Sequence, residues 1–340
     1  LVSKGLEALK DLKCETTDGH TVALWVNTGL ASDASRSLDH GAEGVGLYRT
    51  EVPFLMRDRF PSEEEQRAIY RMHLEAFAPN PVTMRTLDIG GDKSLSYFPI
   101  EEDNPFLGWR GIRITLDHPE IFLPQLRAMM KANVGIENLG IMLPMISHMG
   151  EIDESMKLIR RAHSELLDEG FDVPLPPVGV MIEVPAAVCL AGEIASRVDF
   201  ISVGSNDLTQ YLLAVDRNNS SVADLYCSYH PAVLQALQMI VSAAHEVSTP
   251  VSICGELAGD PGAALLLMAM GYDSLSMNAT NLPKVKSVIR AFTKAEADSL
   301  LSDVMLMHSA DSIQSAIENV LEARGVTRFF RDSIRGRDSR

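Results

Sequence analysis

The chain has 340 residues, of which 46% are apolar and 22% are charged, and its net charge at neutral pH is −16. This length suits one large α/β barrel or two domains of medium size. The acidic balance argues against a nucleic-acid partner, and the lack of an apolar run of about 18 residues argues against a membrane span. Four dispersed cysteines are typical of a reducing compartment, so we expect a cytoplasmic protein.

The two ends of the chain differ in composition from its middle. The chain starts at Leu1 rather than Met, in a helix-like stretch, so we expect residues 1–20 to be the remnant of a linker helix from a longer polypeptide. Residues 21–323 alternate short apolar runs with longer amphipathic ones and are expected to form the main domain. Residues 324–340 hold six arginines without an apolar period, which predicts a basic tail.

Eight short apolar runs predict strands that are buried on both faces. They are Val22–Asn27, Val45–Arg49, Val82–Ile89, Gly140–Ile146, Gly179–Val184, Phe200–Gly204, Val251–Cys254 and Ser274–Met277. The clearest helical patterns between them are Glu63–Phe77, Glu151–Leu167, Ala186–Ser196, Pro231–Val247 and Pro261–Met270. This alternation favours an α/β fold, a closed (β/α)8 TIM barrel, with an open doubly wound sheet as the rival. A long loop, 90–117, separates the third strand from the third helix.

Charged and polar side chains stand at the ends of six of the eight predicted strands. In a barrel these ends meet on one face, where active sites form. Glu183 and Asp207 are 24 residues apart and should end neighbouring strands, close enough to share one divalent cation. Mg²⁺ takes one or two protein carboxylates and fills its remaining positions with water and substrate oxygens. The alternative is that both residues cap helices, with Asp207 capping a helix that starts near Leu208.

Several arginines accompany these carboxylates. Arg49, Arg85 and Arg217 end or follow strands, and Arg110 lies in the long loop. Arginine is the preferred bidentate partner of carboxylate and phosphate, so the group predicts a site for a small polyanion, although surface ion pairs would also use such residues. Cys254 ends the seventh strand, where a protonated thiol could supply a proton or simply pack as a small apolar side chain.

Six segments of the sequence resemble one known family. They are G-A-E-G-V-G-L-Y-R-T-E, T-L-D-I-G-G-D-K, N-P-F-L-G-W-R-G-I-R, V-M-I-E-V-P, G-S-N-D-L-T-Q-Y-L-L-A-V-D-R-N-N and I-C-G-E-L-A-G-D-P. Together they resemble the C-terminal, phosphoenolpyruvate (PEP)-binding domain of PEP–protein phosphotransferase, which is Enzyme I of the bacterial phosphotransferase system. Ser205 and Asn218 depart from the usual G-T-N-D and D-R-G-N patterns in a way that is similar to the nitrogen-related paralogue.

The resemblance implies roles for individual residues. It implies Mg²⁺ as the cofactor, with Glu183 and Asp207 as its ligands, and Cys254 as the proton donor. The residues that it implies for PEP binding are Arg49, Arg85, Lys93, Arg110, Asn206, Asp207 and Arg217.

The resemblance also implies partners. In the family the phosphoryl group of PEP passes to a histidine on a separate N-terminal domain and then to a small histidine phosphocarrier protein, leaving pyruvate, and the PEP-binding domain forms a homodimer. None of the nine histidines lies in a G-G-x-x-S-H-T-type motif, so we expect this chain to bind PEP without completing the transfer alone. A Mg²⁺-dependent lyase acting on pyruvate enolate and a PEP-sensing dimerisation module are the alternatives.

Overall fold

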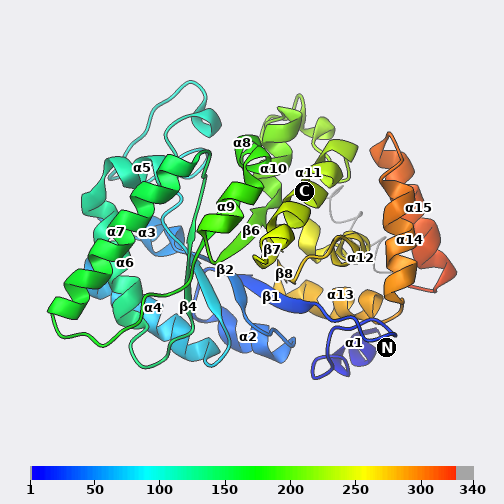
Figure 1. The fold of residues 1–340 in the computed structure, drawn as a ribbon, viewed down its shortest axis with the longest axis horizontal. Coiled ribbons are helices and arrows are strands. Elements are labelled where there is room, and N and C mark those ends of the chain that lie inside the picture. Colours follow the sequence, from blue (N-terminus) through cyan, green and yellow to red (C-terminus); the bar gives the residue numbers. More distant parts are fainter. Residues whose placement is uncertain (1, 327–340) are drawn as a thin grey trace.

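The computed structural model describes residues 2–326 and consists of a barrel of eight parallel strands surrounded by helices (Figure 1). Each strand pairs with the next along the chain, and β8 pairs with β1, for example Met277 with Val26. The strands are β1 Ala23–Thr28, β2 Val45–Arg49, β3 Val82–Arg85, β4 Leu139–Leu143, β5 Val178–Ile182, β6 Phe200–Gly204, β7 Val251–Cys254 and β8 Ser274–Met277. The closed barrel confirms the predicted fold, and the open sheet is excluded.

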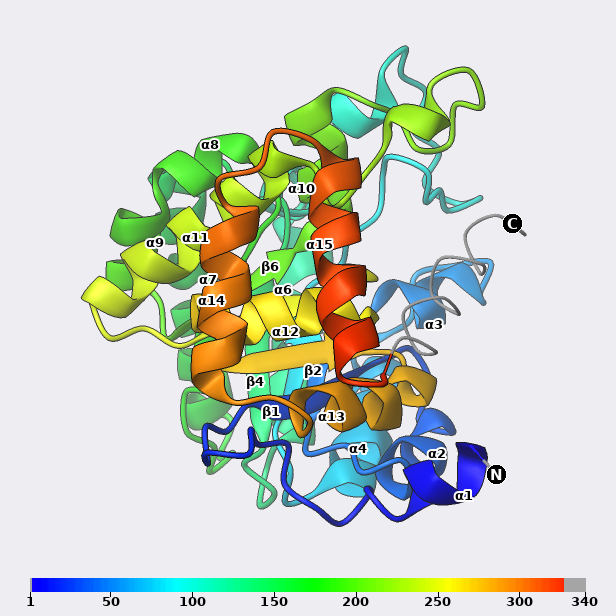
Figure 2. The same ribbon diagram turned by 90° about the vertical axis from the view of Figure 1, so that its right-hand side faces the viewer.

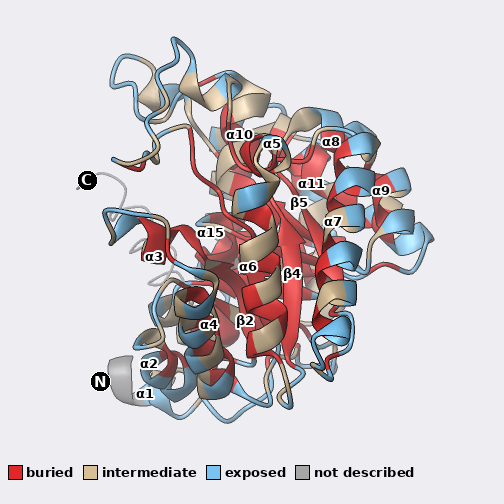
Figure 3. Ribbon diagram, turned by 90° about the vertical axis from the view of Figure 1, so that its left-hand side faces the viewer, coloured by how far each residue is buried: buried red, intermediate tan, exposed pale blue. Residues whose placement is uncertain are grey.

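The helices turn their apolar faces to the barrel and their polar faces to solvent, as the burial colouring of Figure 3 shows. Most follow a strand and cover the outside of the sheet. They are α1 Val2–Glu7, α2 Asp33–Asp39, α3 Glu51–Leu55, α4 Glu63–Phe77, α5 Ile112–Asp117, α6 Pro119–Ala132, α7 Met149–Asp168, α8 Pro185–Cys189, α9 Ala191–Arg197, α10 Ser205–Leu213, α11 Pro231–Glu246, α12 Pro261–Met270, α13 Leu282–Ile289, α14 Lys294–Val304 and α15 Ala310–Ala323.

Local sequence signals explain where several helices begin. Ser62 caps α4 and exchanges hydrogen bonds with Glu65 in a capping box, and the helix covers the predicted residues. Asp260 caps α12, in which Pro261 is the first residue. Within residues 2–326, no helix combines the length and the apolar character that crossing a bilayer requires.

Several expected elements differ in the structure, including the fourth strand, which ends at Leu143 rather than Ile146. The third strand ends at Arg85, four residues before the predicted end, because the chain leaves the ladder there while remaining buried. The main-chain nitrogen of Leu87 donates instead to the Gln125 side chain on α6, at 2.8 Å. The helix expected at Ala186–Ser196 is broken at Leu190 into α8 and α9, and the last residues of the expected long loop form α5.

The segment before β1 packs against the far end of the chain (Figure 2). Lys286 on α13 donates to the main-chain oxygens of Leu9 and Lys10, and Cys14 is buried close to this lysine. Arg324, directly after α15, lies over the Phe292 ring and pairs with Glu296. The rest of the expected basic tail, residues 327–340, lies outside the described part.

Two loops project together from the end of the barrel at which the strands terminate. One follows β3 and covers residues 86–111; the other follows α10 and covers residues 214–230. In Figure 2 the first is cyan and the second yellow-green, and both extend past the helices at the upper right. The side chain of Asn218 in the second loop reaches Asp92 in the first at 3.5 Å. These loops therefore border the face where a barrel's active site forms.

Candidate active site

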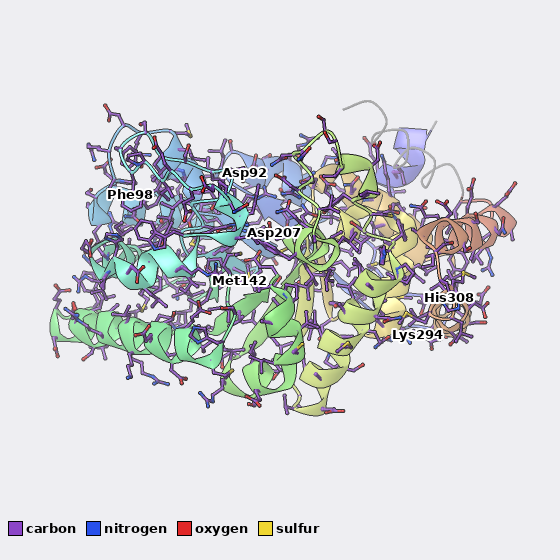
Figure 4. The ribbon with its side chains drawn as sticks, turned by 90° about the horizontal axis from the view of Figure 1, so that it is seen from above. Asp92, Phe98, Met142, Asp207, Lys294 and His308 are labelled. Carbon is purple, nitrogen blue, oxygen red and sulfur yellow. The ribbon has the colours of Figure 1, made fainter. Side chains whose placement is uncertain are left out.

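The strand ends surround a cavity of about 180 Å³. Its lining contains every sequence-predicted site residue except Arg110. The lining residues are Leu47, Arg49, Arg85, Lys93, Met181, Glu183, Gly204, Asn206, Asp207, Arg217, Cys254 and Gly255. Figure 4 shows this end from above, with Asp207 on α10 and Asp92 on the neighbouring loop. Residues that are up to 208 positions apart in the sequence, Leu47 and Gly255, thus share one wall.

A second, larger cavity of about 270 Å³ has a mostly apolar lining. It is lined by the rings of Phe54, Phe60 and Phe98, by prolines, and by one carboxylate, that of Glu120. It contains no lysine or arginine. The smaller, charged cavity is therefore the candidate site for an anionic substrate.

Buried carboxylates hold the basic residues of the charged cavity in place. Arg85 Nη2 is 2.6 Å from Glu51 Oε1, and Lys93 Nζ is 2.8 Å from the same oxygen. Asp88, behind them, lies 3.4 Å from Arg85 and 3.8 Å from Lys93. Glu51 is the first residue of α3, directly after β2, whereas Asp88 follows β3. The two carboxylates fix both cations at the cavity without filling it.

The electrostatics of this wall favour an added anion. Burial lowers the pKa of Arg49, and the adjacent charge of Arg85 lowers it further. Burial also disfavours the charged form of Arg85, but Glu51 and Asp88 outweigh burial and raise the pKa of that guanidinium. Two cations that repel one another across a shared cavity gain stability when an anion binds between them.

Glu183 is a buried carboxylate with only one of its oxygens satisfied. It follows β5 and is fully buried; its Oε1 accepts a hydrogen bond from the main-chain nitrogen of Met145 at 2.6 Å. Its Oε2 has no hydrogen-bond partner. Burial, together with the charges of Asp207 and Asp88, raises the pKa of Glu183 well above its ordinary value. A bound cation would offset the cost of ionising Glu183 in this buried position.

Asp207 lies in the first turn of α10, after the neighbouring strand β6, and is held by an arginine. Arg110 contacts both of its oxygens, at 3.0 and 3.1 Å, and the other side of the same guanidinium contacts Asp88 at 3.3 Å. Burial opposes ionisation of Asp207, but Arg110 keeps the pKa of this carboxyl below its ordinary value. Arg110 thus stands behind Asp207 rather than on the cavity wall, and Asp207 makes no helix-capping hydrogen bond.

The donor set around Glu183 fits a hard divalent cation. The unpartnered Oε2 of Glu183 is the kind of atom that a metal ion satisfies, and Asp207 remains ionised beside it. A Cβ on Gly204 would lie 2.9 Å from that oxygen, so this glycine leaves the space open. Across residues 2–326, no group of three or more His, Cys, Asp and Glu side chains could hold a metal. Two carboxylates completed by water and substrate suit Mg²⁺.

The thiol of Cys254 is in its protonated form and faces an apolar part of the wall. It accepts from the Ser202 hydroxyl at 3.7 Å and donates to the Val203 carbonyl at 3.6 Å. Burial raises the pKa of this thiol. It packs in one cluster with Leu47 and Met181. The cluster also contains Met142 on β4, labelled in Figure 4. A protonated thiol beside apolar side chains can donate a proton to a carbon atom.

The two remaining predicted residues, Asn206 and Arg217, line the cavity from α10 and from the loop after it. Asn206 Oδ1 accepts from the main-chain nitrogen of Glu256 at 3.2 Å, which fixes the amide between α10 and the end of β7. The main-chain oxygen of Asn206 accepts from the Tyr226 hydroxyl at 3.1 Å. Arg217 begins the loop after α10, where its main-chain nitrogen donates to Gln210 at 3.3 Å. Hydrogen bonds to main-chain groups of these residues or from their neighbours, rather than ion pairs, therefore fix the positions of Asn206 and Arg217.

Sequence reasoning did not assign roles to four residues that shape the site. Glu51 and Asp88 are visible as carboxylates at strand ends, but their shared pairing with Arg85 and Lys93 follows only from how the ends of the neighbouring strands β2 and β3 and the loop after β3 pack together. Ser202 lies one strand from Cys254, and it resembles any small buried residue in the sequence. Tyr211 contacts the long loop, more than 100 residues away, and no local pattern marks it.

Comparison with known proteins identifies the family of the chain. The family model described as the PEP-binding domain of PEP-utilising enzymes matches residues 3–294. A phosphoenolpyruvate-dependent phosphotransferase system protein of Escherichia coli is 46% identical over 95% of this chain and 43% of its own length. A phosphoenolpyruvate-protein phosphotransferase of Staphylococcus carnosus is 41% identical over 92% of this chain and 55% of its own length. The chain spans about half the length of these curated relatives.

The fold and the site define a (β/α)8 barrel protein with a cavity of basic and acidic side chains at its strand ends. The chain belongs to the family of PEP-binding domains of PEP-utilising enzymes. Among solved structures, an aldolase/citrate lyase family protein from Burkholderia cenocepacia matches with a TM-score of 0.49 at 17% identity, over 88% of this chain and 98% of that one. A likeness this weak carries no functional argument.

Proposed function

We propose that this chain is the part of a PEP–protein phosphotransferase that binds PEP and releases pyruvate. The observation that carries the proposal is the cavity wall, where four basic side chains meet Glu183 and Asp207. The printed names of the relatives, a phosphoenolpyruvate-dependent phosphotransferase system protein and a phosphoenolpyruvate-protein phosphotransferase, agree with this function.

The charges of the site match PEP when one divalent cation is added. The wall and the ion pairs behind it contain one more basic than acidic side chain. The basic residues are Arg49, Arg85, Lys93, Arg110 and Arg217, and the acidic residues are Glu51, Asp88, Glu183 and Asp207. PEP carries about −2.5 to −3 charges near neutral pH. A bound Mg²⁺ would raise the positive excess to three, which neutralises this ligand.

Glu183 and Asp207 are the residues that would hold Mg²⁺. When bound there, the ion would supply positive charge that stabilises an anionic substrate and the oxyanion formed from it. Arg110 keeps Asp207 ionised, and the Met145 main-chain nitrogen orients Glu183. These contacts prepare both carboxylates before a ligand arrives.

The side chains of the wall then divide the reaction between them. Arginines and Lys93 bind the phosphoryl group and the carboxylate and stabilise the charge that develops as the P–O bond breaks. The electrons of that bond stay on the enol oxygen, and the phosphoryl group leaves to a histidine nitrogen. The Cys254 thiol gives its proton to the methylene carbon, which produces pyruvate, and the thiolate takes a proton back from solvent.

The acceptor histidine, on this proposal, lies on a separate domain of the same protein. The experiment mixes ³²P-labelled PEP and Mg²⁺ with this chain, first alone and then with that histidine domain. We expect pyruvate release and labelled histidine only in the second mixture. Stable label on this chain alone would overturn the proposal. In a separate assay, cleavage of an added 2-keto acid into two carbon fragments would also overturn it.

Further predictions for the whole protein accompany this function. A small histidine phosphocarrier protein as the downstream acceptor, a homodimer formed through this domain, cytoplasmic localisation and membership of the nitrogen-related branch all stay predictions.

A further inference from the structure

Tyr211 touches two parts of the site without lining the cavity. It lies one helical turn after Asp207 on α10, so both residues project from the same face of the helix. Its hydroxyl donates to the main-chain oxygen of Phe106 and accepts from Arg110 Nη1 at 3.3 Å. Phe106 and Arg110 both belong to the loop 86–111. A single hydroxyl therefore joins α10 to this loop.

The contact falls on the neck of the loop, where its two ends pack together. The Gly111 nitrogen donates to the Ile89 carbonyl at 2.9 Å. Gly90 has a φ of +102°, and a Cβ there would lie 2.5 Å from the Trp109 oxygen. The Phe106 ring would be 3.2 Å from a Cβ on Gly91. Lys93 follows this neck directly, so the neck also carries one of the basic residues that line the cavity.

The same neck controls the orientation of a carboxylate in the cavity. Arg110 is 4% exposed and contacts Asp88 and both oxygens of Asp207. Its Nη1 is shared between Asp207 and the Tyr211 hydroxyl. Without the hydroxyl, Nη1 would lose one of its two partners and the Phe106 carbonyl would lose its donor. The guanidinium would keep its contacts with Asp88 and Asp207 but lose one of the contacts that set its orientation.

We propose that Tyr211 is a positioning residue for the transfer reaction, one that fastens the loop 86–111 to α10 and thereby fixes Asp207 for the divalent cation. This inference rests on the proposed function, because it assigns Asp207 to the metal. The hydroxyl acts through Arg110 and contacts neither substrate nor metal. Residues that hydrogen-bond directly to a metal ligand, as Arg110 does to Asp207, typically change metal affinity by roughly 10- to 100-fold. Tyr211 stands one residue behind such a partner, so we expect an effect near the lower end of this range.

The test compares Tyr211→Phe with Tyr272→Phe. The second variant also removes a buried tyrosine hydroxyl that donates to a main-chain carbonyl, that of Leu237 at 2.8 Å. Tyr272 stands just before β8, at the start of the strand, whereas the cavity lies at the strand ends. The first measurement is hydrogen exchange of the metal-free chain. We expect the amides of residues 92–107 to exchange at least about tenfold faster in Tyr211→Phe, and unchanged exchange there in Tyr272→Phe.

The second measurement is Mn²⁺ binding followed by electron paramagnetic resonance, with Mn²⁺ as the probe for the Mg²⁺ site. We expect Tyr211→Phe to weaken Mn²⁺ binding roughly tenfold and Tyr272→Phe to leave it unchanged. Unchanged Mn²⁺ affinity in Tyr211→Phe would overturn the proposal even if the loop exchanges faster, since the hydroxyl would then be purely structural. Failure of wild-type protein to bind Mn²⁺ would instead refute the metal site of the proposed function, while the exchange result would still report on the loop.

Discussion

Arg85 and Glu51 form an ion pair of 2.6 Å in which both side chains are almost fully buried. Glu51 Oε1 also accepts from Lys93, while Oε2 of the same carboxylate has no partner. Glu51, together with Asp88, therefore compensates two cations that would otherwise face each other at the cavity. In this site the basic residues and the acids that hold them form a single charge network.

Loss of the Glu51 charge should destabilise the ligand-free protein. We expect Glu51→Gln to lower the free energy of unfolding by about 3–5 kcal/mol, because Arg85 is then a buried charge without its main partner. Adding PEP with Mg²⁺ should restore much of this loss, since the ligand brings the missing negative charge. Urea denaturation with and without ligand measures both effects. Glu64→Gln, at an exposed pair with Arg67, is the control, and an equal response of the two variants would contradict the account.

Replacement of Cys254 should separate protonation from binding. We expect Cys254→Ala to slow exchange of the pyruvate methyl protons in D₂O by roughly 10²- to 10⁴-fold, the usual contribution of a general acid–base group. Its affinity for PEP, measured by calorimetry, should change little because the cations stay in place. The exposed Cys189 provides the control Cys189→Ala. If Cys254→Ala lost exchange and binding to the same extent, the thiol would be structural.

The space beside Glu183 predicts the effect of a single methyl group. In Gly204→Ala the new Cβ would lie 2.9 Å from Glu183 Oε2 and 3.0 Å from Met181 Sδ. We expect a loss of about 1–3 kcal/mol in stability, as for other overpacked positions, and a loss of Mn²⁺ binding. Gly192→Ala, whose nearest neighbour would be 3.9 Å away, should affect neither property. Mn²⁺ binding at wild-type strength in Gly204→Ala would place the cation elsewhere.

His73 should make stability depend on pH. It is fully buried against Tyr48 and Phe77 and shares a hydrogen bond with Thr28 at 2.9 Å, and burial lowers its pKa to about 4. Between the pKa of the unfolded chain, about 6.5, and this lower value, the unfolded state binds more protons. The contribution of neutral His73 to the free energy of unfolding is therefore fully present above about pH 6.5. It falls by about 3 kcal/mol as the pH drops to 4.

Denaturation curves between pH 4 and 7 measure this dependence. His73→Gln should remove that part of the slope, whereas His308→Gln, at an exposed position seen in Figure 4, should keep it. If the slopes of wild type and His73→Gln coincided, His73 would be protonated in the folded protein.

The sequence predicts the barrel well because parallel strands that are buried on both faces appear as continuous apolar runs. The same signal fails after Arg85. Residues Leu87 and Ile89 are as buried as a strand, but they pack against loop and helix side chains, and Leu87 bonds to Gln125. Burial alone does not distinguish a β-strand from a buried loop. The two differ in the hydrogen-bond partners of their main-chain groups, which the sequence does not show.

The candidate site was also predictable in part. Strand ends meet on one face of a barrel, so Arg49, Glu183 and Cys254 could be assigned to one cavity from their positions alone. The position of Arg110 could not be obtained in this way. It pairs with Asp207 across 97 residues, through a loop whose path follows from glycine turns and tertiary contacts. Networks of this kind depend on three-dimensional contacts rather than on local spacing.

The central claim is that Glu183 and Asp207 bind a divalent cation, and that this cation and the basic side chains of the same cavity together bind PEP. Because Glu183 is favoured in its neutral form without a cation, Glu183→Gln should fold normally and serve as a clean test. Calorimetric titration of PEP into the chain, with and without Mg²⁺, is the direct measurement. We expect one PEP per chain in wild-type protein only when Mg²⁺ is present, and no gain from Mg²⁺ in Glu183→Gln. Binding of equal strength with and without Mg²⁺, or a Mg²⁺ effect that survives in Glu183→Gln, would contradict the claim.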